Sequence, residues 1–377
     1  MTQHVMVFAE GALALSETFI AAHCRSLERY RYTLVAVEKT GDSHPDVPRR
    51  HLIAPGKPAR LERLLFRLGF SRKMDRLIAE LKPDLIHAHY MMGGAFILPY
   101  AKRAGIPVIT TGHGYDVTRR QKMTSGYGAL YALARRGLVK SGELVLPVSD
   151  YLRGKLLQQG FAAKAVSTHY LGIAIPPVAP ANIAGSPPRI VYAGRLVEKK
   201  GLDKVLEAFA LVQRELPEAE LHIAGDGPLR SLVEAALRER VNITYHGALP
   251  HAQVMQLMST ARVFTMPSRE ASDGDSEGFG LVLIEAQAMG VPVVTSIETG
   301  TAESLVPGET GLAVDPHSAK NLADAYLSYL ADAARAAQAG QAAYEFVRRD
   351  FDIRRQTQKL EAIYDRVLAR QSGRREA

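Results

Sequence analysis

The feature that most constrains the fold is a regular alternation of short β-branched runs with longer helical patterns along all 377 residues. Runs of the strand type are HVMVFA, YTLVAVE, HLIAP, LIHAHY, PVITTG and LVLPVS in the first half, then RIVYAG, LHIAG, ITYHG, VFTMP, PVVTS and GLAVD in the second. Strands joined through helices of ten or more residues pair in parallel. The sequence therefore predicts an α/β protein with two doubly wound parallel sheets.

A stretch rich in proline and glycine, GIAIPPVAPANIAGSPPR, separates the two series of strands. Such composition is typical of a linker. We expect one Rossmann-like domain over residues 1–175, a linker over 176–188 and a second Rossmann-like domain over 189–350, the two domains facing each other across a cleft. In sheets of this kind ligands bind at the carboxyl ends of the strands, in the loops that open helices.

Composition excludes several other classes of protein. The single cysteine, Cys24, excludes an internal disulfide and a cysteine-rich metal site, and it favours a reducing compartment such as the cytoplasm. The first residues have no basic segment before their apolar ones, so they are a poor signal peptide. The longest apolar run, YMMGGAFILPYA, is too short to span a bilayer.

The net charge of +8 is unevenly distributed. Residues 1–180 carry 25 Lys and Arg against 13 Asp and Glu, whereas residues 181–377 carry 22 against 26. The densest basic segment, residues 59–82, repeats leucine and phenylalanine at helical spacing, with cations between them: Arg60, Arg63, Arg67, Arg72, Lys73 and Arg76. This pattern fits either a solvated helix face or attachment to an anionic membrane surface. No recognition motif points to nucleic acid.

Two cations follow the first strand of the second half. Arg195 and Lys200 lie five residues apart in RLVEKKG, just before a helical pattern begins at Leu202. Cations at a helix entrance suit a phosphate or diphosphate, which arginine binds with two parallel hydrogen bonds. Ordinary surface residues would account for the same pattern.

The segment EGFGLVLIEAQAMGVPVV places one glutamate before a helix and another inside its apolar stretch. Gly278, Phe279 and Gly280 open this helix and allow a ligand to approach free backbone N–H groups. Glu277 and Glu285 are eight residues apart, or about 12 Å along a helix axis, which exceeds the separation of paired glycosidase carboxylates. A carboxylate buried at Glu285 requires a polar partner. We expect the two glutamates to contact opposite ends of an extended molecule such as a nucleotide sugar.

Several stretches resemble one family over most of the chain. YAGRLVEKKGLDKVLEAF, LHIAGDGPLR, HGALP, VFTMPS and EGFGLVLIEAQAMGVPVV are similar to the donor-binding domain of retaining GT-B glycosyltransferases of glycosyltransferase family four. The resemblance implies that Arg195 and Lys200 stabilise a leaving diphosphate, that Glu277 contacts the transferred sugar and that Glu285 holds the ribose. It further implies a metal-independent transfer with retention of configuration and no cofactor.

The same resemblance assigns further donor contacts to glycines. Gly194 ends the first strand of the second domain, and Gly247 ends HG in the motif HGALP. Gly11 lies in a loop after the first strand of the chain, where the family pattern brings a glycine close to the diphosphate. The next residue, Ala12, departs from the common two-glycine form of that loop.

The first half of the chain agrees with the family at three places. His113 ends a strand in PVITTGHGYDV, and the family pattern puts it over the sugar, although a structural histidine fits this position equally well. SETFI resembles a bacterial subgroup that builds exopolysaccharides. The segment 351–377 resembles the terminal helix that crosses back onto the first domain.

Two other motifs were considered for metal binding. Asp273 and Asp275 form DGD in a polar loop, and His87 and His89 share one face of a strand without an obvious third ligand. We expect the DGD segment to form a loop beside the sugar site. We expect His87 and His89 to line the cleft. The motif GDGP lacks the glycine spacing of a dinucleotide site, which disfavours nicotinamide chemistry.

The sequence thus predicts a retaining hexosyltransferase that moves a sugar from a nucleoside diphosphate to a glycan or lipid-linked glycan acceptor in cell-surface polysaccharide synthesis. We expect it in the cytoplasm, attached peripherally to the inner face of the membrane through residues 59–82. The alternatives are an epimerase or a phosphorylase on the same fold, and a non-catalytic module that binds nucleotide sugars.

Overall fold

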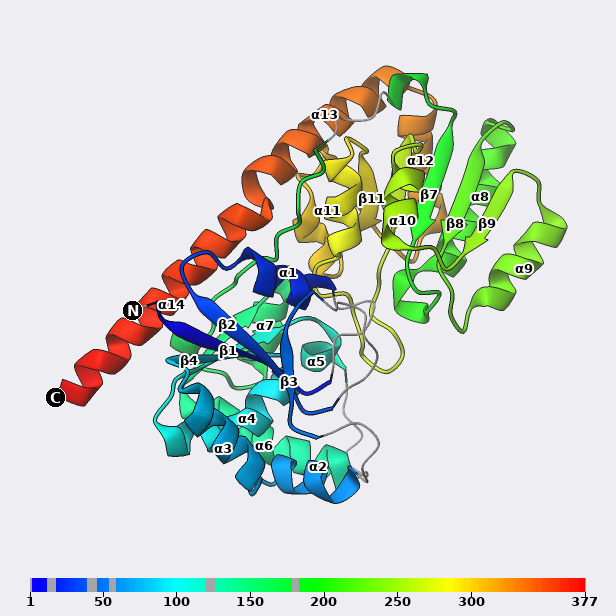
Figure 1. The fold of residues 1–377 in the computed structure, drawn as a ribbon. Helices are drawn as coiled ribbons and strands as arrows, with labels where there is room; N and C mark the ends of the chain where they lie inside the picture. The colour runs from blue at the N-terminus through cyan, green and yellow to red at the C-terminus, as the bar shows by residue number, and fades with distance from the viewer. Residues whose placement is uncertain are drawn as a thin grey trace. The chain divides into compact units, whose positions relative to one another are not determined.

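The chain forms two compact units, each built on its own parallel sheet (Figure 1). A computed structural model describes residues 2–11, 18–38, 46–53, 59–119, 126–177 and 183–376. Unit 1 comprises Met1–Gly172 together with Ile353–Ala377, and unit 2 comprises Ile173–Asp352. Residues 178–182 of the expected linker lie outside the described residues.

Six strands form the sheet of unit 1 in the order β3-β2-β1-β4-β5-β6. Their bounds are β1 (His4–Ala9), β2 (Arg31–Ala36), β3 (Arg49–His51), β4 (Leu85–His89), β5 (Val108–Gly112) and β6 (Leu144–Pro147). All neighbouring strands pair in parallel. Because the chain reverses its direction across the sheet between β1 and β4, the loops after these two strands diverge and leave room for a ligand.

Unit 2 repeats this topology, in the order β12-β11-β10-β7-β8-β9. The strands are β7 (Arg189–Ala193), β8 (Glu220–Ala224), β9 (Ile243–Gly247), β10 (Val263–Met266), β11 (Val293–Ser296) and β12 (Gly311–Val314). The predicted α/β class with two doubly wound sheets is confirmed. The reversal in this sheet falls between β7 and β10, which pair directly.

Helices cover both faces of each sheet (Figure 1). Unit 1 contains α1 (Thr18–Ser26), α2 (Arg60–Arg67), α3 (Arg72–Leu81), α4 (Met91–Ala104), α5 (Tyr115–Thr118), α6 (Gly126–Ser141), α7 (Asp150–Gln158) and α14 (Ile353–Glu376). Unit 2 contains α8 (Leu202–Glu215), α9 (Arg230–Glu239), α10 (His251–Met258), α11 (Leu281–Ala288), α12 (Ala319–Leu330) and α13 (Ala333–Asp350). The C-terminal helix α14 packs against α1.

The side chains of β1 show why both faces of the sheet need a cover. Every residue of this strand is buried. Val5 and Val7 belong to a core cluster that includes Tyr364 of α14, whereas Phe8 packs against Phe66 of α2, with ring centroids 5.7 Å apart. Successive side chains of a strand point to opposite faces, so the nearly continuous apolar run His4–Ala9 requires helices on both sides.

The basic segment 59–82, expected as one helical pattern, forms two helices. α2 ends at Arg67, and α3 begins at Arg72. Gly69 between them has φ +84°, a left-handed conformation that stops a helix. The hydroxyl of Ser71 then accepts a hydrogen bond from the backbone N–H of Met74 and caps α3. Within the described part of the chain, no helix combines the length and apolar character needed to cross a bilayer.

Helix α4 approaches β5 so closely that a glycine is required at one position. A Cβ atom on Gly94 would lie 2.1 Å from Oγ1 of Thr110, whereas a Cβ atom on the preceding Gly93 would meet nothing closer than 3.7 Å. We expect Gly94→Ala to lower the free energy of unfolding by about 1–3 kcal/mol, because it overpacks the helix against the sheet. Gly93→Ala is the matched control, and it should leave stability unchanged or raise it by up to about 1 kcal/mol. Equal effects of the two variants in urea unfolding would contradict this packing.

Candidate functional site

The candidate site in unit 2 lies where the sheet reverses. The loop after β7 holds Gly194, Arg195 and Lys200, and the loop after β10 leads to Glu277. Since β7 and β10 are parallel neighbours, their carboxyl ends meet at the same edge of the sheet. The structure therefore brings together cations and a carboxylate that are nearly eighty residues apart in the sequence.

Two lysines and two carboxylates form a connected ion-pair cluster at this edge. Lys200 Nζ lies 2.8 Å from a carboxylate oxygen of Glu277, and Lys199 Nζ lies 2.9 Å from Asp275 and 3.8 Å from Glu277. Burial alone would raise the pKa of Glu277, but Lys200 and Lys199 bring it to about 2. Burial lowers the pKa of Lys200, and Glu277 opposes that shift. Glu277 is thus a permanent carboxylate.

Sequence reasoning missed Lys199, the buried member of this cluster. The adjacent pair KK in VEKKG was visible in the sequence, but nothing local indicates that the two lysines turn to different carboxylates. Asp275 is one of the two carboxylates of the DGD motif. Its carboxylate forms an ion pair with Lys199. Asp273 accepts a hydrogen bond from the backbone N–H of Asp275, which stabilises the loop.

Arg195 differs from the two lysines. Its side chain is exposed, and among the described residues it forms no hydrogen bond or ion pair, while its charge still contributes to the low pKa of Glu277. The lysines are matched one to one by carboxylates, so Arg195 is the cation of this edge that remains available to an anion. Guanidinium groups bind phosphate oxygens through two parallel hydrogen bonds.

The entrance of α11 supplies the polar backbone next to these charges. Gly280 caps the helix with φ +87°, and a Cβ atom there would lie 3.0 Å from Met266. Gly278 is buried. Phe279 is 2% exposed and packs on Phe351 at a centroid distance of 5.3 Å. The phenylalanine side chain therefore anchors the turn, and any donor contact by this residue would use its backbone.

Glu285 lies on α11 and is half-buried, with 18% of its side chain exposed. Its carboxylate is 2.9 Å from Nε2 of His251, the first residue of α10. This hydrogen bond raises the pKa of His251. Among the described residues, neither Arg195 nor Lys200 pairs with Glu285, and Lys200 pairs with Glu277 instead. The imidazole of His251 is largely exposed and can give way to a ligand hydroxyl.

Gly247 ends β9 two residues before Leu249 and four before His251. Its carbonyl accepts a hydrogen bond of 2.7 Å from the backbone N–H of Gly225, and a Cβ atom placed on it would meet no heavy atom within 4 Å. This hydrogen bond joins the end of β9 to the loop that follows β8. No comparable space exists at Gly225, whose Cβ would collide with the carbonyl oxygen of Gly194 at 1.8 Å.

In unit 1, His113 follows β5 and is fixed by an aspartate. The carboxylate of Asp116 accepts hydrogen bonds from the backbone N–H groups of His113, Gly114 and Met91 at 2.8–3.0 Å. Tyr90, at the end of β4, has φ +65°, and its ring lies 4.8 Å from that of His113. A bulky residue held at positive φ marks a strained position of the kind found at functional sites.

Gly11 is exposed after β1, and no atom of the described residues lies within 4 Å of a Cβ built on it. Ala12, where the sequence departs from the family pattern, lies outside the described residues. A pocket of about 230 Å³ opens beside Gly11 and is lined by Tyr90, Tyr115 and two ion pairs. These pairs are Arg67–Glu10 at 2.5 Å and Arg63–Glu38 at 2.6 Å.

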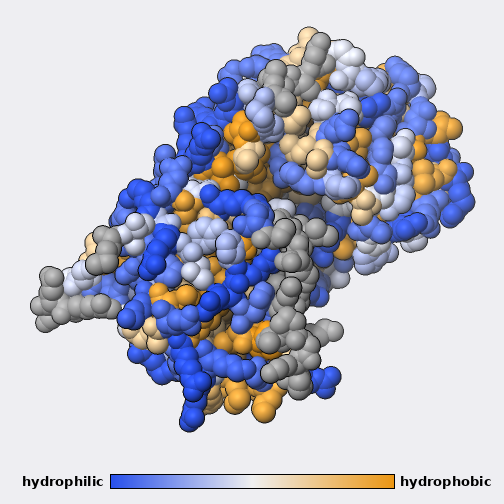
Figure 2. Space-filling model, viewed as in Figure 1, coloured by the Kyte–Doolittle hydropathy of each residue, from blue (hydrophilic) through white to orange (hydrophobic). Residues whose placement is uncertain are grey.

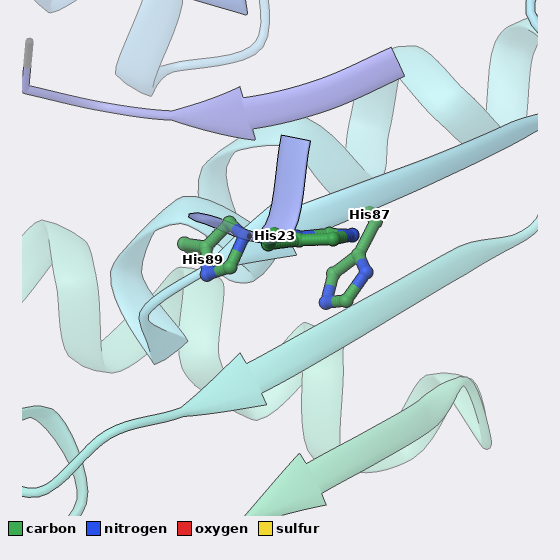
Figure 3. Close-up of side chains that lie close together, drawn as sticks. All are labelled: His23, His87 and His89. Carbon is green, nitrogen blue, oxygen red and sulfur yellow. Dashed lines mark hydrogen bonds between the residues drawn. The ribbon is translucent and has the colours of Figure 1, made fainter. Parts of the chain in front are cut away.

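A buried histidine cluster lies behind His113. Figure 3 shows His23 of α1 between His87 and His89 of β4, and a small cavity of about 40 Å³ adjoins all three. His23 supplies the third imidazole that sequence reasoning did not find, because it comes from a helix more than sixty residues away. Their ring nitrogens lie within 4.8 Å of one another, close enough to be considered for a metal ion. A second candidate group, Glu298, Asp315 and His317, lies at the surface of unit 2.

Comparisons with known proteins agree with this architecture. The structure of the Anabaena protein HepE, solved in complex with UDP and glucose, superposes with a TM-score of 0.75 over 96% of this chain and 99% of that one, at 17% sequence identity. That likeness defines the class of fold. It is the GT-B arrangement of glycosyltransferases.

The sequence identifies the family. Residues 178–346 match the family described as Glycosyl transferases group 1, and residues 16–175 match Glycosyltransferase Family 4. A GDP-mannose-dependent α-(1-6)-phosphatidylinositol monomannoside mannosyltransferase of Mycobacterium tuberculosis is 32% identical over 295 residues, which cover 73% of this chain and 74% of the relative. The chain belongs to the group 1 glycosyltransferases.

Another relative carries the name of a polysaccharide. The putative colanic acid biosynthesis glycosyltransferase WcaL of Salmonella typhimurium is 31% identical over 222 residues, or 57% of this chain. The match spans 53% of the length of that relative, so the chain corresponds to about half of it.

The buried histidines predict a strong dependence of stability on pH. Burial lowers the pKa of the three imidazoles of the cluster and of two neighbours, His113, which bonds to His89, and His169, which lines the same small cavity. The pKa falls to about 3 for His23 and His113, to about 4 for His169, and well below the ordinary value for His87 and His89. The unfolded chain binds these protons near pH 6.5, so the stabilisation is complete above that pH and is lost as the pH falls toward the folded values. We expect the free energy of unfolding to fall by about 1.4 kcal/mol per histidine between pH 7.5 and 5.5.

Urea titrations at several pH values measure this effect. His169→Gln should remove about one fifth of it and serves as an internal calibration. A free energy of unfolding that stays constant from pH 7.5 to pH 5.5 would show that the cluster is not neutral and buried in solution.

Proposed function

We propose that this chain is an active glycosyltransferase that transfers a sugar from a nucleoside diphosphate to an acceptor hydroxyl with retention of anomeric configuration. The observation that carries the proposal is Arg195, exposed and without a side-chain partner among the described residues, beside the Lys200–Glu277 pair at the carboxyl edge of the sheet in unit 2. Relatives support the donor class, since one is named for GDP-mannose and the Anabaena structure holds UDP and glucose. These two names contain different nucleotide bases, guanine and uracil, so the proposal does not specify the base of the donor.

The ion-pair cluster suggests how the departing diphosphate is stabilised. As the bond from sugar to phosphate breaks, negative charge grows on the phosphate oxygens and positive charge grows on the anomeric carbon. Arg195 and Lys200 offset the first, and the carboxylate of Glu277 orients Lys200 and accepts hydrogen bonds from sugar hydroxyls. Fixed charges of this kind need no reorganisation during the reaction. In this mechanism the acceptor proton passes to the departing phosphate, and neither a metal ion nor a cofactor takes part.

The remaining donor contacts follow from the geometry of α11 and its neighbours. The ribose hydroxyls would displace the exposed imidazole of His251 and donate to the carboxylate of Glu285, which already accepts a hydrogen bond there. Backbone groups at Gly194, Gly247 and Gly280 would adjoin the nucleotide. The role of His113 over the sugar is proposed from the family resemblance alone.

The acceptor is proposed from relatives and from the pocket beside Gly11. Relatives named for colanic acid and amylovoran synthesis point to a growing surface polysaccharide, and the mannosyltransferase relative acts on a phosphatidylinositol mannoside. A glycan or lipid-linked glycan fits a pocket lined by two tyrosine rings and by charged pairs. We therefore propose a hexosyl transfer onto such an acceptor.

The central test separates the two charges. Arg195→Ala should lower kcat by about 10² to 10³, with a smaller change in the KM for donor. The reason is that the guanidinium group of Arg195 stabilises charge that develops in the transition state. Glu285→Gln should weaken donor binding about tenfold or more, since a hydrogen bond to a charged group contributes about 1.5–3 kcal/mol. The measurements are steady-state transfer and calorimetric titration with the preferred donor, chosen by thermal shift among nucleotide sugars.

Matched controls isolate these effects. Arg214→Ala removes an equally exposed arginine from the last turn of α8, at the opposite end of the sheet, and should change neither constant. His251→Gln removes the partner of Glu285 but leaves the carboxylate, so it should leave donor affinity unchanged or improve it. Donor binding without release of nucleoside diphosphate would instead indicate a non-catalytic module, and loss of turnover in EDTA would overturn the metal-free mechanism.

A peripheral membrane attachment is proposed for the surface of α2. Leu61, Leu64, Leu65, Leu68 and Phe70 are 38–71% exposed, and Figure 2 shows apolar surface gathered over α2. Three exposed arginines, Arg60, Arg72 and Arg76, form no ion pair within the described residues. An apolar helix face bordered by free cations is the pattern of helices that lie in the interface of an anionic membrane.

The structure changes which residues should be tested for this attachment. Arg63, Arg67 and Lys73 pair with Glu38, Glu10 and Glu62 inside unit 1, so their replacement would disturb the fold as well as the surface. We expect the double variant Leu61→Gln, Phe70→Gln to reduce co-sedimentation with phosphatidylglycerol vesicles at least tenfold, because each lost apolar side chain removes roughly 1.5–3 kcal/mol of burial. Leu237→Gln, Val241→Gln, on exposed positions of unit 2, should have no effect. Equal binding of both variants would refute the proposal.

A further inference from the structure

Four histidines and a tyrosine of unit 1 form one continuous hydrogen-bonded chain. Nε2 of His113 lies 3.0 Å from Nδ1 of His89, and Nε2 of His89 lies 3.0 Å from Nδ1 of His23. Nε2 of His23 lies 2.9 Å from the hydroxyl of Tyr364. Figure 3 shows the imidazole of His23 between those of His87 and His89.

The chain continues beyond the tyrosine to β5. The hydroxyl of Tyr364 also lies 2.5 Å from Nδ1 of His87, and Nε2 of His87 lies 2.7 Å from Oγ1 of Thr111. The five links thus join α1, β4, β5 and the C-terminal helix α14. Both ring nitrogens of His23, His87 and His89 are engaged.

The protons in this chain cannot be placed independently of one another. Burial lowers the pKa of all four histidines well below neutrality, so each imidazole carries one N–H and one lone pair. The tyrosine hydroxyl likewise supplies one proton. Each histidine inside the chain must therefore donate to one neighbour and accept from the other. The oxygen of Tyr364 could accept from both of its neighbours, but its own proton would then have no partner in the chain. Two arrangements avoid this: all four histidines protonated on Nδ1, or all four protonated on Nε2.

The threonine at the end of the chain selects between the two arrangements. In the part of the chain that the structure describes, the side chain of Thr111 has one hydrogen-bond partner, Nε2 of His87. If His87 donated to it, the buried hydroxyl proton of Thr111 would have no acceptor among the described residues, and Nδ1 of His113 would also lack a partner among them. If Thr111 donates instead, one unpaired group remains. Since an unmatched buried polar group is destabilising, the second arrangement is favoured.

That remaining group is Nδ1 of His113. This atom is buried and has no hydrogen-bond partner among the described residues, while the side chain as a whole is half-buried at the carboxyl end of β5. With the chain running from Thr111, the proton on His113 is carried by Nδ1. His113 is thereby prepared to donate a hydrogen bond, and it cannot act as a base through that atom.

We propose that this chain holds His113 as its Nδ1–H tautomer, so that the ring nitrogen of His113 outside the chain is a hydrogen-bond donor and not an acceptor. Any effect of this tautomer on sugar transfer rests on the function proposed above; the tautomer itself does not. The positioning residues are Thr111, His87, Tyr364, His23 and His89. They act through His113 and need no contact with substrate.

A metal ion at His23, His87 and His89 is the competing interpretation. It would require the three imidazoles to surrender hydrogen bonds that the structure already forms. The side-chain partners of these rings among the described residues are histidine, tyrosine and threonine, and none is a carboxylate that would offset the charge of a divalent ion. The observations therefore favour the hydrogen-bonded chain.

Nuclear magnetic resonance of the full chain, labelled with ¹⁵N at histidine, tests the proposal directly. Long-range ¹H–¹⁵N correlations distinguish the two tautomers of a neutral imidazole. We expect the Nδ1–H form for all four histidines in the ligand-free protein at pH 7.5. The Nε2–H form at His113, or a mixture of forms along the chain, would overturn the proposal. So would a stoichiometric metal ion found by elemental analysis of the purified protein.

Tyr364→Phe breaks the chain at its centre and retains the ring that fills the core. We expect His23, His89 and His113 to lose the uniform Nδ1–H form, and kcat/KM for donor to fall between about two- and tenfold, the range of one neutral hydrogen bond. Tyr30→Phe is the matched control. Its ring packs on Tyr364 at 5.2 Å, but its hydroxyl bonds to Asp365 and lies outside the chain, so tautomers and kinetics should not change.

Thr111→Val provides a second, nearly isosteric variant if the first does not fold. It removes the proton that sets the direction, and the four histidines should then show mixed tautomers while the links between them persist. Unchanged tautomers in this variant would refute the role of Thr111. If wild-type protein shows the expected tautomers but transfers no sugar from any donor, the proposed function fails and the hydrogen-bonded chain stands.

Discussion

Both units depend on the pairing of two parallel strands at the point where the strand order of the sheet reverses. In unit 1 these strands are β1 and β4, and in unit 2 they are β7 and β10. Parallel strands point their carboxyl ends to one edge, and the reversal of strand order keeps the following helices from closing over that edge. The cluster of Lys199, Lys200, Asp275 and Glu277 exists because this pairing brings two distant loops together. In unit 1, the same arrangement places Gly11 and Tyr90 at one pocket.

The parts of this structure that the sequence predicted are those set by local patterns. Eleven of the twelve strands lie on the expected runs, because a strand buried on both faces needs an uninterrupted apolar sequence. The exception is β3, Arg49–His51, which overlaps the expected run HLIAP only at His51 and is not buried. Gly280 was expected at the entrance of α11, since only a glycine readily adopts the positive φ found there. The break at Gly69 was not foreseen, because the helical spacing of leucine and phenylalanine continues through the glycine. A Cβ atom built on Gly69 would lie 3.3 Å from Pro99 of α4, a contact that the local sequence does not reveal.

Contacts between distant segments escaped sequence reasoning. The pairing of Glu285 with His251 depends on how α10 approaches α11, and neither segment encodes that approach alone. His23 and Tyr364 are separated by 341 residues, yet they share a hydrogen bond in the core of unit 1. The sequence shows which residues are charged but not which residues they pair with. Lys199 and Lys200 are neighbours in sequence, yet Lys199 pairs with Asp275 and Lys200 pairs with Glu277. The roles of Arg195, Glu277 and His113 remain predictions.

The return of α14 to unit 1 has a consequence for synthesis on the ribosome. Unit 1 begins at the first residue but includes residues 353–377, whose Leu360, Ile363 and Tyr364 belong to its core. The nascent unit 1 must therefore wait while all of unit 2 is translated, roughly 10–40 s at about 5–20 residues per second. During that interval the side of β1 that α14 later covers has no permanent partner, and the intervening unit can fold first. Residues 353–377 complete a unit that was begun before unit 2, so truncation after residue 352 would leave unit 2 whole and unit 1 open to chaperones and proteases.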